Sequence, residues 1–198
     1  PGHSSTPVPD NDNCAFWITH LDPNVTVNDI TRAIRDCGKI WSVRISTERV
    51  VDVRDAAAQL VFFTRRGAAR FWDRYGIRPG AFVVQGKTAR VNWNRQRFAE
   101  QSRPPYHTRC IRVIGTPQVV NPDRILRFLE SRIRFQVDEH EVIGGRDEHL
   151  CIVEIRFAAY RGQASLAVQA LQNQGQLTRD PTFEVTYRPD PCDEVNDD

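Results

Sequence analysis

The feature that most constrains this sequence is an order of predicted secondary structure that occurs once in each half of the chain. In the first half, residues 14–21 alternate like a strand, and a capping-box-like pair, Thr26 and Asp29, begins a helix that we expect Gly38 to stop. The remaining predicted elements are strands at 39–47 and 56–63, a helix at 65–75, a hairpin turn at 85–86 and a strand at 88–93. The resulting order is β-α-β-β-α-β.

The second half repeats this order. Asn121 and Pro122 have the residue types of an N-cap and a first helical position, and they begin the first of two predicted helices. The predicted elements are strands at 110–115, 135–143, 150–157 and 182–189, and helices at 121–135 and 162–175. The repeat predicts an α+β fold of two tandem ferredoxin-like units, each a four-stranded antiparallel sheet backed by two helices.

The composition between and around the repeats suggests boundaries. We expect a flexible leader at residues 1–12, a first domain at 13–96, a polar, Pro-containing linker at 97–107 that could begin with a short helix, a second domain at 108–189 and an acidic, disordered tail at 190–198. The chain begins with Pro and contains no Met, so we also expect it to be part of a longer protein.

The charge differs between the halves. Residues 1–106 hold 16 Lys and Arg against 10 Asp and Glu, a net charge of +6, whereas residues 107–198 hold 11 against 15, a net charge of −4. Almost all the cations are Arg, which suits phosphate forks and stacking on bases, although a general Arg bias in composition is an equal explanation. The first half is therefore the better candidate for an anionic partner.

The residues of both repeats resemble a pair of RNA recognition motif (RRM) domains, and the resemblance covers residues 13–188. Residues 16–21, Phe-Trp-Ile-Thr-His-Leu, match the first-strand motif of that family, except that His20 replaces Asn. Residues 55–62 keep only the core-facing half of the third-strand motif, because Ala57 and Gln59 stand where the family has aromatic rings.

The resemblance implies binding of single-stranded RNA by stacking bases on rings that stand out from the sheet. Trp17 is then the one ring left on the first sheet, where it is either an open platform or is covered by another segment. The RNA-binding residues that we expect are Trp17, Thr19, Arg44, Gln59, Arg90, Asn92, Arg95 and Arg97.

The second repeat departs further from the RRM motifs. Arg112 occupies the first-strand ring position, and Ile152 and Glu154 occupy the third-strand positions. Because these two strands are neighbours in the family, Arg112 and Glu154 are expected to pair. We interpret this domain as a degenerate RRM used for packing or protein contact. The alternative for the whole chain is a protein-protein adaptor whose sheets do not bind RNA.

Several other residues have both a structural and a functional interpretation. Trp41 is expected to pack at a sheet edge, and Trp72 and Trp93 in the core. The Arg run on the second helix and its exit is expected to be a solvated face, with a secondary phosphate patch as the minor alternative; it comprises Arg65, Arg66, Arg70, Arg74 and Arg78. The segment with His140 and His149 is expected to be a polar hairpin rather than a metal site.

Nothing in the sequence indicates catalysis. There is no Gly in the first loop to cradle a phosphate, and no Ser-His-Asp or Cys-His arrangement is evident. Five widely spaced Cys and no C-x-x-C favour a reducing, nuclear or cytoplasmic compartment. We therefore expect a non-enzymatic protein with no cofactor, no small-molecule substrate and no membrane span, whose partners are single-stranded RNA and, through the second domain, a protein.

Overall fold

The computed structural model describes residues 7–46, 55–144, 149–178 and 180–193. Its contacts divide the chain into two compact units. The first unit comprises the described residues up to Lys39, Val43–Ser102 and the residues from Pro191; the second comprises Ile40–Ser42 and Arg103–Asp190. Between the predicted strands at 39–47 and 56–63, the charged stretch 48–55 is expected to be a loop, and all of it except Asp55 lies outside the described residues.

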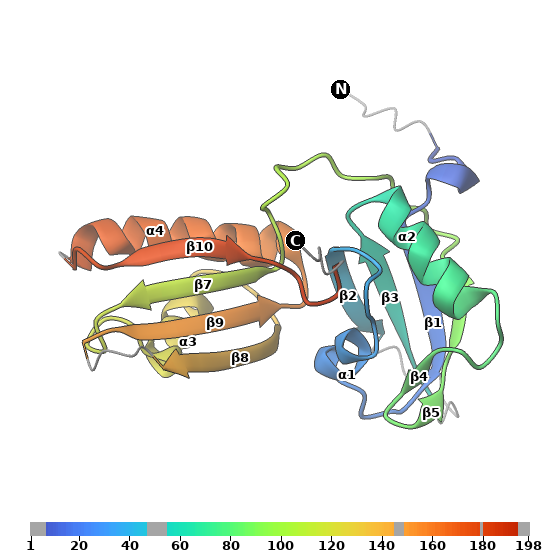
Figure 1. Cartoon of the computed structure of the whole chain (residues 1–198), viewed down its shortest axis with the longest axis horizontal. Coiled ribbons are helices and arrows are strands. Elements are labelled where there is room, and N and C mark those ends of the chain that lie inside the picture. The colour runs from blue at the N-terminus through green and yellow to red at the C-terminus, as the bar shows by residue number, and fades with distance from the viewer. Residues whose placement is uncertain (1–6, 47–54, 145–148, 179, 194–198) are drawn as a thin grey trace. The chain divides into compact units, whose positions relative to one another are not determined.

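The first unit contains a four-stranded antiparallel sheet in the order β2-β3-β1-β6, with both helices on one side of it (Figure 1). A separate hairpin, β4 and β5, precedes the edge strand β6. The elements are η1 (Asp10–Asp12), β1 (Ala15–Leu21), α1 (Val27–Arg32), β2 (Ile40–Ser46), β3 (Ala56–Phe62), α2 (Arg65–Phe71), the π-helical turn η2 (Trp72–Gly76), β4 (Val83–Val84), β5 (Lys87–Thr88) and β6 (Arg90–Trp93).

The second unit has the same architecture, with a sheet in the order β10-β7-β9-β8 (Figure 1). Its elements are β7 (Cys110–Gly115), α3 (Pro122–Glu130), β8 (Val137–Gly144), β9 (Cys151–Phe157), the turn η3 (Tyr160–Ala164), α4 (Ser165–Thr178) and β10 (Glu184–Arg188). In both units the first and third long strands pair at the centre of the sheet. The predicted α+β fold of two tandem ferredoxin-like units is therefore confirmed.

The alternation of β1 sends its odd and even residues to opposite sides of the first sheet. Phe16 and Ile18 are fully buried with the helices, whereas Trp17 between them is exposed. The side chains that form the core on the helix side include Phe16, Ile18, Ile30, Ile34, Leu60, Phe62, Phe71 and Phe82. The hydrophobic side of β1 thus fixes which residues remain for the other face.

Local capping signals in the sequence correctly predicted where helices begin. The Thr26 hydroxyl accepts from the Asp29 backbone N–H at 3.2 Å, and the Asp29 carboxylate accepts from the Thr26 N–H at 2.8 Å. The Asn121 side chain likewise caps α3 by accepting from the Arg124 N–H at 3.4 Å. The predicted hairpin turn is also present, with Gln85 and Gly86 at φ values of 52° and 76°.

Other boundaries differ from the predictions. Helix α1 ends at Arg32, six residues before Gly38, and Gly38 instead takes a φ of 137° where the chain passes the backbone of Gly67. The predicted strand at 88–93 is interrupted at Ala89, whose N–H bonds to the Phe82 carbonyl at 2.9 Å. In the described chain, residues 97–107 contain no helix.

The start of the expected acidic tail is ordered, which corrects the prediction of disorder for residues 190–193. Asp190 is 2% exposed because its carboxylate accepts from the Arg109 guanidinium at 2.9 and 3.1 Å. Arg109 itself is buried and also contacts Asp138. Cys192 is buried as well. Only residues 194–198 of the expected tail lie outside the described chain.

The five cysteines are all free, and four of them are buried. Burial raises the pKa of the Cys14 and Cys37 thiols to about 11 each, and it raises the pKa of Cys110 further still. Cys151, at the start of β9, is the more accessible one. Among the described residues, no helix is both long and apolar enough to cross a membrane.

Candidate nucleic-acid interface

Trp17 lies on the side of the first sheet that faces away from the helices. Its exposed fraction is 36%, whereas the neighbouring Phe16 and Ile18 are completely buried. Single exposed apolar side chains are common on protein surfaces, so the residues around Trp17 decide what the ring can bind. Of the two possibilities that the sequence left, an exposed or a covered side chain, the structure shows Trp17 exposed.

Polar side chains flank Trp17 on both neighbouring strands. Trp17 pairs directly with Gln59 on β3 and with Asn92 on β6. Thr19, two residues further along the same face, pairs with Arg90. Directly opposed residues have Cβ atoms about 4.5–5.5 Å apart, so the ring is bordered by two amides. An amide can donate to and accept from a base edge, which a hydrocarbon neighbour could not do.

The two stacking positions of β3 carry no ring, as the sequence predicted. Ala57 and Gln59 are both partly exposed on this strand. The next position on the same face, Val61, is buried and pairs with Ala15, which is also buried. The accessible part of the face is therefore centred on Trp17 and does not extend to that end of β1.

Three further cations of the expected RNA-binding set, Arg44, Arg95 and Arg97, differ in their contacts. Arg44 on β2 and Arg95 after β6 are exposed, and within the described residues neither guanidinium group has a hydrogen bond or an ion pair. Arg97 instead contacts the N-terminal segment, donating to the Val8 carbonyl at 2.9 Å and pairing with Asp10. Arg97 is thus partly neutralised, while Arg44 and Arg95 keep their charge available.

Lys87 is held in place by the fold. Its ammonium group donates to Asp55 at 2.6 Å and to the Leu21 carbonyl at 3.3 Å. The hydrogen bond from Lys87 holds the pKa of the Asp55 carboxyl below its usual value. This ion pair anchors the β4-β5 hairpin beside the end of β1, where the face with Trp17 meets the sheet edge.

The corresponding face of the second unit is covered by ion pairs. Arg112 on β7 is directly opposite Glu154 on β9 and donates to it at 2.8 Å, so the predicted pair is confirmed. Arg188 lies 3.3 Å from the same carboxylate. Arg156 pairs with Glu139 and lies 3.6 Å from Glu141. These cations are already compensated, and the face presents carboxylates where a phosphate would have to approach.

The other Trp residues are structural, as expected. Trp41 is buried. The rings of Trp72 and Trp93 lie 6.4 and 4.3 Å from that of Phe16, on the helix side of the sheet. Arg65 of the predicted Arg run stacks over Trp93 at 4.8 Å and does not form part of a free cationic face.

The described part of the segment with His140 and His149 offers no metal site. His140 lies exposed on β8, and 145–148 lie outside the described residues. No group of three or more His, Cys, Asp or Glu is placed to hold a metal ion among the described residues.

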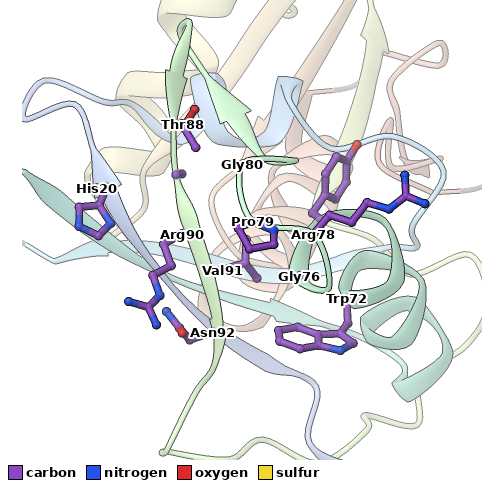
Figure 2. Close-up of a pocket in the computed structure, with 12 residues that line it drawn as sticks. His20, Trp72, Gly76, Arg78, Pro79, Gly80, Thr88, Arg90, Val91 and Asn92 are labelled. Carbon is purple, nitrogen blue, oxygen red and sulfur yellow. The ribbon is translucent and has the colours of Figure 1, made fainter.

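A pocket that the sequence analysis did not predict lies at the edge strand β6 of the first unit. Its volume is about 540 Å³, and its lining includes His20, Arg78, Thr88, Arg90 and Asn92. Figure 2 shows His20, Arg90 and Asn92 on one side of the strand and Arg78, Pro79 and Trp72 on the other.

The pocket depends on backbone geometry that sequence patterns signal weakly. The register of β1 with β3 shifts between Ile18 and Leu21, and His20 adopts a φ of 61° within this irregularity. Such a bulge redirects a side chain away from the alternation of its strand. The one signal in the sequence was the residue type at position 20. The RRM motif has Asn there and this chain has His, and both residue types adopt a φ above zero more often than most others.

Both units therefore have the strand order of a ferredoxin-like, RRM-like fold, and their two sheets differ chemically. No protein-family model and no curated protein matches the sequence.

Several solved structures that are similar to the chain contain two or more RNA recognition or RNA-binding domains. The first two RRM domains of yeast poly(U) binding protein (Pub1) share 14% identity, with a TM-score of 0.34 over 88% of this chain and 99% of that one. RNA recognition domains 1 and 2 of Sex-lethal from Drosophila melanogaster share 16% identity, with a TM-score of 0.31 over 89% and 100% of the two chains. The RNA-binding domain of Hrp1 in complex with RNA shares 11%, with a TM-score of 0.31 over 90% and 98%. At these values the fold assignment rests on the strand order and register of each sheet.

Proposed function

We propose that this chain is a non-enzymatic RNA-binding protein whose first unit binds single-stranded RNA on the sheet face around Trp17. The exposure of Trp17 between Gln59 and Asn92 is the observation that carries the proposal. One base stacks on the indole, and the flanking amides hydrogen-bond to base edges. Thr19 and Arg90 continue this surface along the strands, and Arg44 and Arg95 contribute positive charge near the phosphates.

The proposal predicts modest affinity. Base-aromatic stacking is worth about 1–3 kcal/mol per base, and the first sheet carries one such ring where the RRM motifs have up to three. The net charge of +6 over residues 1–106 adds a sequence-independent attraction that weakens as salt rises. Binding is therefore expected to depend strongly on ionic strength and weakly on sequence.

Substituting Trp17 tests the platform. We expect Trp17→Ala to weaken binding of labelled single-stranded RNA by about 5- to 150-fold, which corresponds to the loss of about 1–3 kcal/mol of stacking. Trp17→Phe keeps a ring and should retain most of the affinity. Fluorescence anisotropy at several salt concentrations measures both. Equal affinity of wild type and Trp17→Ala, or binding without salt dependence, would overturn the proposal.

The face of the second unit favours a different role for that unit. Glu154 is held by two cations, Arg112 and Arg188, on a face with no ring at its central positions. We propose that the second unit contacts a protein, because charged pairs of this kind suit a polar protein surface better than they suit a nucleic-acid backbone. A chain that acts only as a protein-protein adaptor is the second candidate function.

A further inference from the structure

We propose that RNA bound at Trp17 does not end at the sheet edge but turns round strand β6, so that a neighbouring nucleotide of the same strand enters the pocket beside it. This inference rests on the proposed function, since the strand is anchored by the base on Trp17. It assigns a second nucleotide site that lies at the edge of the sheet and on its helix side, beyond the face that carries Trp17 (Figure 2).

The pocket and the Trp17 surface share a border. Asn92 is directly opposite Trp17 in the β1-β6 register, and Asn92 also lines the pocket. Arg90, opposite Thr19, belongs to both surfaces in the same way. An RNA strand that runs from the indole toward β6 therefore reaches the pocket with its next nucleotide. No further strand of this sheet lies beyond β6, because β6 is the edge strand.

The charge of the pocket suits a phosphate. Of its twelve lining residues, none is Asp or Glu, and His20, Arg78 and Arg90 are basic. Within the described residues, neither Arg78 nor Arg90 has an ion pair or a hydrogen bond to another side chain. Arg90 and Arg78 therefore offer guanidinium groups to a phosphate on the two sides of β6 (Figure 2).

The far wall of the pocket suits the flat, apolar part of a nucleotide. The ring of Trp72 lies directly over Gly76, since a Cβ at Gly76 would come within 2.0 Å of that ring. Gly80, with a φ of 85°, and Pro79 then bring the chain back toward β5. The Thr88 hydroxyl at the rim can bond to a ribose or a base. A volume of about 540 Å³ lies within the range of small-ligand sites.

His20 lines the pocket on the side of β6 that carries Arg90 and Asn92 (Figure 2). Its ring nitrogen lies 3.4 Å from the Thr19 hydroxyl, and its φ of 61° turns it away from the alternation of β1. Bulges of this kind are frequent beside binding sites because they aim a side chain that a regular strand would place elsewhere. The irregularity in β1 thus places the His20 imidazole where the bound RNA would turn round β6. This ring can stack on a base or donate a hydrogen bond.

Arg78→Ala tests the path, because Arg78 lines the pocket and lies outside the face that carries Trp17. We would titrate random-sequence single-stranded RNA of about four and about eight nucleotides, lengths near the lower end of known single-strand sites. The longer RNA should bind wild type more tightly than the shorter one. Arg78→Ala should abolish this gain and lower the slope of log affinity against log salt by about 0.7 for the longer RNA only.

Arg66→Ala is the matched control, because Arg66 is exposed on α2 of the same unit and does not line the pocket. It removes the same charge and should keep the gain with length. If Arg78→Ala gains as much affinity from the longer RNA as wild type does, the path round β6 is overturned and the Trp17 proposal stays intact. If Trp17→Ala binds RNA as tightly as wild type, the proposed function itself is overturned.

Amide NMR locates the second nucleotide directly. The longer RNA should shift the signals of Gly76, Gly80 and Thr88, and the shorter RNA should not. A nucleoside monophosphate that shifts the same signals equally in wild type and Trp17→Ala, with no effect of RNA length, would show a site for free nucleotides and would overturn the continuous path.

Discussion

At the scale of single residues, the alternation of side chains along β1 determines which residue of this strand the first unit exposes. Phe16 and Ile18 are buried against the helices, so Trp17 must point away from them. A register shift of one residue would bury Trp17 and expose two apolar side chains, at a cost of about 1.5–3 kcal/mol for each large side chain left exposed. The packing that stabilises the unit is therefore also what presents its candidate platform.

Arg109 has the opposite character, because it is a charged residue with a purely internal role. Its guanidinium is 1% exposed and holds Asp190 through two hydrogen bonds, Asp138 through an ion pair and the Phe157 carbonyl at 3.1 Å. Arg109→Ala leaves two buried carboxylates uncompensated and is expected to lower the free energy of unfolding by about 3–5 kcal/mol. Urea denaturation followed by circular dichroism measures the change.

The exposed Arg134 provides the control for this experiment. Arg134→Ala removes one positive charge from the same unit without touching the buried cluster, so its effect should stay within about 0.5 kcal/mol. If the two variants unfold at the same urea concentration, the cluster around Arg109 contributes nothing beyond its charge.

At the scale of elements, the sequence predicted where helices begin better than where they end. The start of α1 depends on Thr26 and Asp29, which interact locally and can be recognised as a pattern. Its end does not follow from the pattern, because the apolar spacing continues through Ile34, which is buried although it lies beyond the helix. The Ile34 N–H bonds three residues back, to the Thr31 carbonyl. Periodicity thus reports burial and not the hydrogen bonds that define a helix.

The same limit applies to the candidate site. The alternation of the strands and the RRM resemblance predicted which residues would surround Trp17, and the structure places Gln59 and Asn92 directly opposite it. The β6 pocket depends on a register shift at His20 and on the turn that brings Arg78 back toward the sheet. Both are tertiary features without a periodic pattern in the sequence.

Gly38 has a role at this scale that differs from the predicted helix stop. It lies before β2 with a φ of 137°, and a Cβ there would come within 2.9 Å of the Gly67 Cα on α2. Gly38→Ala is therefore expected to cost about 1–3 kcal/mol, since it adds both backbone strain and a clash with main chain. Thermal unfolding compared with Gly144→Ala, where a Cβ meets nothing within 4 Å, measures this cost. Equal stability of the two variants would contradict the close packing of Gly38 on α2.

At the scale of the whole molecule, one fold occurs twice with opposite surface chemistry. Residues 1–106 carry a net charge of +6 and an exposed ring, whereas residues 107–198 carry a net charge of −4 and a sheet face of ion pairs. Because the backbone topology is shared, the different functions that we propose for the two units depend on side chains at matching positions, above all Trp17 and Arg112.

This contrast predicts separable partners for the two units. A protein captured by the full chain should remain bound after nuclease treatment, because its contact is with the second unit and not through RNA. Glu154→Lys reverses a charge at the centre of that face and should weaken the capture, while RNA affinity should not fall. Loss of every captured protein on nuclease treatment would leave RNA binding as the sole proposed function.

The burial of the cysteines has a consequence for how this protein can be studied. Thiolate is the reactive form of cysteine, so buried thiols with a raised pKa react slowly with alkylating agents in the folded chain. Cys151, on β9 of the second unit, is the one cysteine whose side chain is only half-buried. A maleimide dye therefore attaches to the native chain at one position without any engineering, and it leaves the face that carries Trp17 unlabelled.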